Sequence, residues 1–477
     1  MAIGTCFQND SVALRNLATQ WIYEAQVWLA SPSERSRMNL AGLQTLCLLH
    51  LARETCGVGG ETSWISAGSL LRTAMHMGLH RDPENLHPMS VLQAELRRRL
   101  WATILEIVLQ SSVDAVGPPM ISQSDFDTRL PSNFDDDQLS ERSKFSPSPR
   151  PSNNFTQSTV QIAIHRSFAV RLDIVKYVNQ LNSPTSYDQT LHWNNELTNA
   201  CRALSAMLQP NYDPAGILPK RLSLFQLRMA EHMVHRFFLA LNHPWMLPAQ
   251  SNPAYYFARK MCVDTSLKLY RAFATGSPAG DSGTASQSDD FTRLSTCGHG
   301  AFRSVPTLAV LTICLELLWQ AQEDRPFRQS MSIDHQLDRL GPAAEADMNT
   351  TGGIGSGVGA RQDLLDAAKY SVEWAHRRLQ AGETNVRGRV LYAALLTQVQ
   401  ALQRGAPDGD VERLVLDTIS NEVQNCYQLL KGTAEYVGAG RNGYDSNGLG
   451  MGCEWDWEKS VSLHSLSPAY SRICTRC

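Results

Sequence analysis

The chain has 477 residues, of which 43% are hydrophobic and 19% are charged, as in a soluble globular protein of one large domain or two to three ordinary ones. Its 43 basic and 46 acidic residues give a formal net charge of −3 at pH 7. This balance excludes the overall basic surplus that is typical of proteins that bind nucleic acid through phosphate contacts. A local basic patch on the surface is still compatible with the sequence.

Helical periodicity dominates the sequence from its start, and alternating strand patterns are nearly absent. Residues 17–53 carry apolar side chains at helical spacing with a break at 31–33, which predicts a helical hairpin. We expect a helix over residues 66–76 to end at Gly78, because glycine readily adopts the left-handed conformation that terminates many helices.

The best-defined helix begins at Ser90. Ser90 and Gln93 have the spacing of a capping box, in which each side chain satisfies a backbone donor of the first turn. Leu96, Leu100 and Ile104 follow at intervals of four residues, and this spacing predicts that they share a buried face of the helix.

The sequence Gly117-Pro118-Pro119 ends that helix, and residues 140–158 are a Ser/Pro-rich loop or linker. Further helices are predicted at 191–208, 222–241, 305–321, 362–380, 391–403 and 411–430. Flexible Gly- and Ser-rich segments at about 276–290 and 345–359 flank the 305–321 helix. The expected fold is all-α, with a linker at 276–300, a C-terminal helical region at 301–437 interrupted by a Gly-rich loop at 345–360, and a poorly ordered tail at 438–477.

The eleven cysteines are scattered, and their number is odd. Some of them, such as Cys47 and Cys314, lie inside apolar helical runs, which favours reduced thiols in an intracellular compartment over a disulfide framework. The first eleven residues have neither the basic nor the apolar region of a secretory signal. The most hydrophobic stretch, 305–321, contains Glu316 and is too short for a bilayer span, so we expect a buried helix and no membrane association.

A series of short motifs between residues 70 and 137 resembles a known family. The motif residues to which we assign a structural or regulatory role are His80, Arg81, Asp82, Pro83, Glu95, Arg97, Arg98, Arg99, Trp101, Gly117, Pro118, Asp125, Asp127 and Pro131. Their order resembles the middle homology region of fungal-specific zinc-cluster transcription factors. Two later segments, His243-Pro244-Trp245 and residues 382–388, are also similar, so that the resemblance covers about residues 12–405.

This resemblance implies an all-helical regulatory domain over residues 1–275, truncated at its N-terminus relative to the family, in a nuclear or cytoplasmic protein that often controls a metabolic pathway. It implies partners in the transcription machinery or its coregulators, and a possible small-molecule effector. The family's zinc cluster needs six closely spaced cysteines, but the only C-x-x-C here is Cys474–Cys477. We therefore expect no cofactor in this chain, with zinc and DNA contacts confined to a missing zinc-cluster module. A truncated gene model, a splice form and a regulator without this module remain open.

The run Arg97-Arg98-Arg99 has two interpretations. It can contact phosphate or an acidic partner, or it can pair internally with Glu95, Asp82 or a carboxylate of residues 135–137. We favour internal pairing, because three arginines in one helical turn cover most of the helix circumference and at least one points into neighbouring structure.

The run Asp135-Asp136-Asp137 suggests the metal-binding aspartates of helical terpene synthases. Those enzymes need carboxylates along a helix and a second metal motif, whereas Pro131 and Asn133 place this run in a loop. We therefore expect no catalytic residue and no metal ligand. A helical metal-dependent enzyme and a non-transcriptional scaffold remain the alternative functions.

Three remaining motifs are weaker. Residues 355–360 fit a relaxed dinucleotide-binding pattern without the strand that such a site needs, and we interpret them as a linker. His232 and His235 lack the further ligands of a metal site and are expected to be ordinary core or surface histidines. Trp455 and Trp457 alternate with acidic residues, which is typical either of an activation segment or of an aromatic anchor packed on the domain.

Overall fold

The computed structural model describes residues 1–7, 12–30, 38–140, 147–151, 153–182, 185–212, 221–274, 290–325 and 362–440. Over these residues the chain forms fourteen α-helices and no β-strand, which confirms the all-α prediction. The helices are α1 (Val12–Leu29), α2 (Leu40–Cys56), α3 (Ser63–His76), α4 (Val91–Asp114), α5 (Thr159–Arg166), α6 (Phe168–Val178), α7 (Tyr187–Leu208), α8 (Leu224–Met246), α9 (Tyr256–Ala274), α10 (Asp290–Cys297), α11 (Ala301–Glu323), α13 (Gln362–Gln380), α14 (Arg387–Gln403) and α15 (Asp408–Gly440).

The described residues fall into two compact units. The first comprises Met1–Thr265 and Arg271–Pro306, and the second comprises Ser266–Tyr270 and the described part of Thr307–Val461. The family-like motifs between residues 70 and 137 all lie in the first unit. α11 begins in the first unit and continues in the second.

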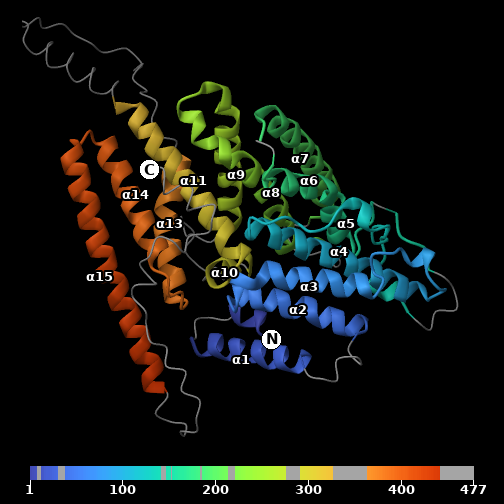
Figure 1. Cartoon of the computed structure of the whole chain (residues 1–477). Helices are drawn as coiled ribbons and strands as arrows, with labels where there is room; N and C mark the ends of the chain where they lie inside the picture. Colours follow the sequence, from blue (N-terminus) through green and yellow to red (C-terminus); the bar gives the residue numbers. More distant parts are fainter. Residues whose placement is uncertain are drawn as a thin grey trace, which may run out of the picture. The chain divides into compact units, whose positions relative to one another are not determined.

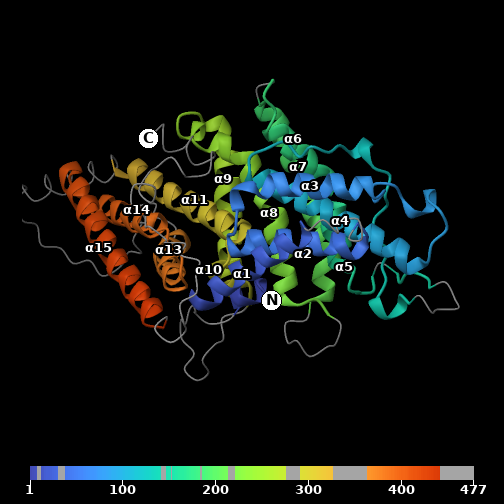
Figure 2. The same cartoon turned by 60° about the horizontal axis from the view of Figure 1, so that its bottom comes forward.

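The core of the first unit is built around α4, which packs against α2, α3, α5 and α6; Figures 1 and 2 both show α2 and α3 running side by side. Leu100 and Ile104 of α4 are buried, as expected from their spacing, and they belong to the same apolar cluster as Leu71 of α3 and Leu172 of α6. Leu96 is only half-buried, contrary to the prediction. The reason is that Glu95, not Leu96, is turned toward the loop that covers the start of this helix.

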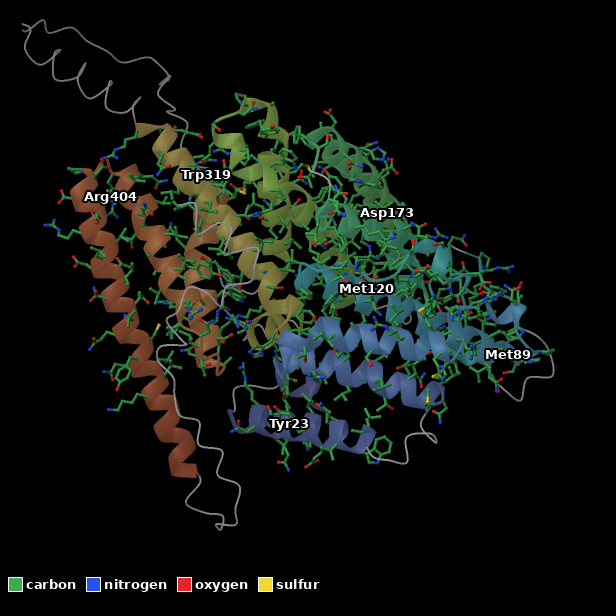
Figure 3. The ribbon with its side chains drawn as sticks, viewed as in Figure 1. Tyr23, Met89, Met120, Asp173, Trp319 and Arg404 are labelled. Atoms are coloured by element: carbon green, nitrogen blue, oxygen red, sulfur yellow. The ribbon has the colours of Figure 1, made fainter. Side chains whose placement is uncertain are left out.

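The N-terminal elements form a smaller apolar cluster. Ala18 and Ile22 of α1 pack with Ala2 and Val58, next to the 3₁₀ turn η1 (Ile3–Phe7) and the end of α2. α2 ends at Gly57, which has φ of +72°, and a Cβ added there would lie 2.7 Å from the His299 ring, so that only glycine fits. The opposite face of α1 is open to solvent, and Figure 3 marks Tyr23 on it.

In the second unit α13, α14 and α15 lie side by side in both views (Figures 1 and 2). Arg389 of α14 pairs with Glu422 of α15 at 2.7 Å, and Trp374 of α13 is buried. Of the described helices, α11 alone has the length and apolar composition that would let it cross a membrane, a property it shares with the core helices of soluble proteins. Its Ile313 and Leu317 are buried in the protein, as expected for a core helix, and Figure 3 marks Trp319 near its end.

Four helices were not singled out by the sequence, namely α5, α6, α9 and α10. α10 lies within the segment 276–300 that we interpreted as a linker. It is only eight residues long, and two buried side chains, Phe291 and Leu294, hold it to the first unit. Helices this short are fixed by tertiary packing rather than by their own periodicity, which is why the pattern misses them. α15 likewise extends to Gly440, into the predicted tail.

Candidate functional site

The turn that follows α3 is the first part of the candidate site. Gly78 has φ of +73° and ends α3 as predicted, and Leu79 after it is fully buried. Asp82 then caps the 3₁₀ turn η4 (Pro83–Asn85) by accepting the backbone N–H of Glu84 at 3.1 Å, with Pro83 at the first position of the turn. The sequence His80–Pro83 is thus a tight helix exit whose carboxylate points inward.

Asp82 forms a two-pronged ion pair with Arg98 of α4. Arg98 Nε and Nη2 donate to the two carboxylate oxygens at 3.0 and 2.8 Å, and the backbone N–H of Arg129 donates at 2.9 Å. Burial raises the pKa of Asp82, but the hydrogen bonds from Arg98, Arg129 and Glu84 outweigh it and lower this pKa from 3.8 to about 2. The pair therefore stays ionised in a site that is almost closed to solvent.

Asp127 fastens the loop after α4 to the same turn. Its carboxylate accepts the backbone N–H of Asp82 at 2.6 Å, Arg81 Nε at 3.0 Å and Asn85 Nδ2 at 3.1 Å. The backbone of Asp127 donates to the carbonyl of His80 at 3.0 Å. The hydrogen bond from the Asp82 backbone is the main reason that the pKa of Asp127 is lowered. Two segments about 45 residues apart are thus joined side by side.

Glu95 and Arg99 hold the next part of the loop. Glu95 is 1% exposed and accepts the backbone N–H of Ser132 at 3.0 Å and Arg99 Nε at 3.1 Å. Arg99 also pairs with Asp136 at 2.6 Å and donates to the carbonyl of Phe134 at 3.1 Å. The internal partners predicted for Arg98 and Arg99 are therefore confirmed. We call these contacts of residues 79–85 and 125–136 with α4 the loop-anchoring network.

Arg97 behaves differently from its two neighbours. It donates to the backbone carbonyl of Met77 at 3.0 Å, and burial lowers its pKa. Its contact therefore ties α4 to the end of α3 without a carboxylate, and all three arginines of the run face the protein rather than an external phosphate.

An aromatic group lies beneath the network. Trp101 is 1% exposed and meets Phe126 edge to face, with ring centroids 5.7 Å apart. The His80 ring lies 6.5 Å from Trp101, and Phe126 in turn contacts Phe168 of α6. Trp101 thus anchors both the turn after α3 and the loop after α4 to the core.

The exit from α4 is a strained turn. Val116 and Met120 have φ of +50° and +51°, which is uncommon for residues with a side chain, most of all for a β-branched one. Between them, a Cβ on Gly117 would lie 3.1 Å from Trp64, and Trp64 Nε1 donates to the carbonyl of Pro118 at 3.1 Å. Figure 3 marks Met120 in this turn.

The remaining motif residues serve the same loop. Asp125 accepts the backbone N–H of Ser122 at 2.6 Å and closes the turn η5 (Gln123–Asp125). Gln123 in this turn donates to Asp173 of α6 at 3.2 Å, a residue marked in Figure 3. Pro131 is buried where the loop meets Glu95.

Two aspartates of the run 135–137 form ion pairs with basic side chains. Asp135 is 1% exposed and pairs with Arg150 at 2.7 Å, while Asp136 pairs with Arg99. The turn η6 (Asp136–Gln138) is a single 3₁₀ turn, so that the run lies in a loop as predicted. Among the residues that the structure describes, no three His, Cys, Asp or Glu side chains are grouped as around a metal ion.

Two buried ion pairs of α4 were missed by the sequence analysis. Arg171 of α6 has no exposed side-chain surface and donates to both oxygens of Glu106 at 2.6 and 2.8 Å. Arg236 of α8 pairs with Asp114 and also donates to Gln110 at 3.0 Å. The carboxylates of Glu106 and Asp114, in the mostly apolar second half of α4, are the local signal for such pairs, but they do not identify the partners.

Several buried polar side chains lie around Asp114. Ser304 donates to Asp114 at 3.1 Å. Burial and the negative charge of Asp114 raise the pKa of Glu54 from 4.5 to about 7. His50 lies between Ser66 and Ser111, at 3.1 and 3.3 Å, and burial lowers its pKa to about 4. His232, whose ring stacks on Phe302, is buried, and its pKa falls to about 3.

In chemical terms the candidate site fastens one part of the protein to another. The carboxylates of the loop-anchoring network are each paired with arginine or backbone N–H groups. The tryptophans of the predicted activation segment, Trp455 and Trp457, and the linker 355–360 lie outside the described residues. Their roles stay predictions.

Comparison with known proteins supplies the context. Residues 1–205 match the family model of the fungal specific transcription factor domain. The chain is 34% identical to "Transcription factor opdR" of Penicillium oxalicum over 90% of this chain and 53% of that protein. It is 32% identical to "Transcription factor lepE" of Aspergillus flavus, over 89% of this chain and 48% of that protein.

A third relative is "Aspyridones cluster regulator apdR" of Emericella nidulans, 33% identical over 68% of this chain and 44% of that protein. The chain spans about half the length of the curated relatives it matches. No solved structure matches the chain.

Proposed function

Because residues 1–205 are a fungal specific transcription factor domain, we propose that this chain is the regulatory part of a fungal transcription factor and catalyses no reaction. The observation that carries the proposal is the likeness to named transcription factors over about nine-tenths of the chain. We further propose that it controls genes of a metabolic pathway, since one relative is named a cluster regulator.

The proposed mechanism is conformational. The loop-anchoring network holds residues 125–136 against α4 through contacts such as the Arg99–Asp136 ion pair, which a competing ligand or partner surface can replace. A coregulator or small effector that binds one arrangement of the loop better than the other would shift the balance between them. The partners are components or coregulators of the transcription machinery, and the protein acts in the nucleus.

Under this proposal the chain itself carries no zinc or other cofactor. Specific DNA contacts come from a zinc-cluster module, and the chain alone binds duplex DNA weakly, without sequence preference and less tightly as salt rises. Metal analysis beside a DNA titration at physiological salt tests this. Two zinc ions per chain, or nanomolar binding to one particular DNA site, would overturn it.

The regulatory role is tested by fusing the chain to an unrelated DNA-binding module in a fungal reporter strain. The fusion is expected to enter the nucleus and to change reporter output, and Arg98→Ala is expected to alter that change, whereas the exposed control Arg166→Ala leaves it intact. Arg98→Lys keeps the positive charge at this position. A reporter output between those of the wild type and Arg98→Ala would show that the effect of Arg98→Ala is not simply loss of the fold. A chain that stays cytoplasmic and leaves every transcript unchanged would favour the scaffold alternative.

The tail provides a separate test. Residues 441–477 fused alone to the DNA-binding module are expected to activate the reporter, and replacing Trp455 and Trp457 with alanine to abolish this activation. A silent fusion would support the packing interpretation of the tail. Magnesium-dependent turnover of a prenyl diphosphate by the purified chain would instead support the terpene-synthase alternative, which the pairing of Asp135 and Asp136 with arginines disfavours.

A further inference from the structure

Residues 147–151, with the sequence Pro-Ser-Pro-Arg-Pro, are bound to the loop after α4, and we call them the proline segment. The backbone N–H of Arg150 donates to the carbonyl of Asn133 at 2.8 Å, and Asn133 Nδ2 donates to the carbonyl of Pro151 at 2.9 Å. The Arg150 guanidinium pairs with Asp135 at 2.7 Å. Arg150 is therefore the side chain that joins the proline segment to a nearly buried carboxylate.

Ser148 lies in the middle of the proline segment, outside any helix, and is exposed. The proline after it disfavours a helical backbone at Ser148, because the proline ring clashes with the residue before it. An exposed serine that is followed by proline in an extended chain is the substrate form that proline-directed protein kinases accept. The other serines followed by proline lie outside the described residues and are Ser31, Ser146, Ser183, Ser277 and Ser467.

We propose that Ser148 is a phosphorylation site for a proline-directed serine/threonine kinase, and that its phosphate draws Arg150 away from Asp135. In the transfer, the Ser148 oxygen forms a bond to the γ-phosphorus of magnesium-bound ATP, and the bond from that phosphorus to the bridging oxygen breaks. ADP leaves, and the hydroxyl proton passes to the catalytic base of the kinase and then to solvent.

The charge and reach of the phosphate favour its capture of Arg150. A phosphoserine carries about −1.5 to −2 charges at pH 7 and three strong acceptor oxygens. Arg150 follows two residues later, at most about 7 Å along an extended chain, so its guanidinium can form a two-pronged contact with the phosphate. Asp135 offers a single negative charge. The Arg150 side chain is 36% exposed, so it can leave Asp135 without opening the core.

Repulsion acts in the same direction. Gln138 of η6 donates to the carbonyl of Ser148 at 3.5 Å, so Ser148 lies beside this turn. Asp136 and Asp137 of the same turn are exposed, and a phosphate next to them is repelled by their carboxylates. Attraction to Arg150 and repulsion from η6 would therefore both weaken the contact between the proline segment and residues 133–138.

Release of the proline segment would loosen the loop-anchoring network at Asp135 and Asp136. The regulatory meaning of this release rests on the proposed function, whereas the phosphate and the loosening are measured on the purified chain. A chain that is phosphorylated and loosened, yet leaves the reporter unchanged, would contradict the proposed function and support the site.

The first experiment incubates the purified 477-residue chain with magnesium-ATP and either a mitogen-activated protein kinase or a cyclin-dependent kinase. Peptide mass spectrometry should locate a phosphate on Ser148. Ser148→Ala should lose the phosphate from this segment, and Ser146→Ala, which removes the neighbouring serine-proline step, should keep it. An unmodified Ser148 with both kinases, or phosphate on Ser146 alone, would overturn the proposal.

Amide hydrogen exchange then measures the loosening. The backbone N–H groups of Arg150 and Asp135 donate to Asn133 O and Gln138 Oε1 at 2.8 and 3.0 Å. In the phosphorylated chain both should exchange at least about tenfold faster, the factor expected when one charged hydrogen bond is lost. The N–H of Asp82, bound elsewhere in the network, is the internal control and should not change. Unchanged exchange at Asp135 in a chain fully phosphorylated on Ser148 would refute the release.

Arg150→Ala tests the part played by the arginine. Exchange at Asp135 should already be fast in this variant, and phosphorylation should accelerate it by less than about twofold, because both changes remove the same contact. A further tenfold acceleration would show that Arg150 is not the group that the phosphate captures. Should the variant fail to fold, the wild-type chain with and without phosphate still decides, since its exchange at Asp135 must rise.

Discussion

The two halves of α4 use charge in opposite ways. Its first half carries three neighbouring arginines, which are partly exposed and bind the end of α3, the turn after it and the loop after α4. Its second half carries single carboxylates, Glu106 and Asp114, which receive buried arginines from α6 and α8. The first arrangement attaches a loop, and the second joins helices across the core. Breaking an ion pair costs more the more deeply it is buried, and the side chains of Arg171 and Arg236 are 0% and 5% exposed against 13% and 18% for Arg98 and Arg99. The two halves should therefore differ in what they contribute to stability.

The largest effect is expected in the second half. Arg171→Ala leaves Glu106 buried without its main partner and should lower the free energy of unfolding by about 3–5 kcal/mol. Arg166→Ala, an exposed arginine on the preceding helix, should change it by less than about 0.5 kcal/mol. Urea denaturation of both variants measures the difference. A second change, Glu106→Gln in the Arg171→Ala background, should restore part of the loss, and further destabilisation there would contradict the buried-charge explanation.

The apolar centre of α4 should come next. Leu100→Ala removes a buried side chain and should cost about 2–5 kcal/mol of unfolding free energy. Leu96→Ala is the matched change one turn earlier, where the side chain is only half-buried, and it should cost distinctly less. Thermal denaturation compares the two, and equal losses would mean that the burial assigned to this face is wrong.

The loop-anchoring network should give a smaller loss of stability. Arg98→Ala removes both charged hydrogen bonds to Asp82, and we expect a loss of about 2–3 kcal/mol. Arg98→Lys should retain only part of this, since lysine cannot form the two-pronged contact. Limited proteolysis of residues 125–136 should also speed up in Arg98→Ala, and an unchanged rate of cleavage would show that the loop is held by other contacts.

The contribution of the Asp82–Arg98 pair to the free energy of unfolding depends on pH in a defined way. The folded pKa of Asp82, about 2, lies below its ordinary 3.8. Its contribution is therefore fully present above about pH 4 and is lost as the pH falls from 4 toward 2. In Arg98→Ala this acid-sensitive contribution should be much reduced, so that the stability curves of variant and wild type approach each other below pH 3.

The smallest effect concerns Glu54, beside Asp114. Its folded pKa of about 7 lies above the ordinary 4.5, so the folded state holds a proton there that the unfolded state has released. Stability from this group is thus lost as the pH rises from 5 through 7, by about 1–2 kcal/mol in a partly screened site. Glu54→Gln should remove this fall between pH 5 and pH 8. Taking the difference from wild type cancels the contribution of His232, whereas His50 lies 3.7 Å from Glu54 and its contribution stays in the difference. A difference independent of pH would refute the raised pKa.

Sequence patterns predicted the structural features that depend on the local spacing of residue types. The face of Leu100 and Ile104, the end of α3 at Gly78 and the helix at 362–380 all follow from spacing or from one residue's conformational preference. The ion pairs of Arg98 and Arg99 could also be anticipated, because three adjacent arginines cannot all face solvent. The short helix α10 could not be predicted, since its eight residues are held in place by the packing around Phe291.

Long-range partners were beyond prediction for a physical reason. Glu106 and Arg171 are 65 residues apart, and nothing in either neighbourhood specifies the other. Likewise the Cys56 thiol reaches the carbonyl oxygen of Ala2 only because the N-terminal residues fold back on the end of α2. A pair of this kind is determined by how helices pack, and a single sequence records only its two separate ends.

The backbone bonds of the loop-anchoring network have a consequence for chain length. The N–H groups of Asp82, Arg129 and Ser132 are each directed to a particular carboxylate, and Asp127 is bonded to the backbone of His80. Surface loops normally tolerate inserted residues, because few of their backbone groups have fixed partners. Here one inserted or deleted residue between 79 and 82, or between 127 and 132, would shift every later donor away from its acceptor. This connection has the length constraint of a paired strand, although it contains none.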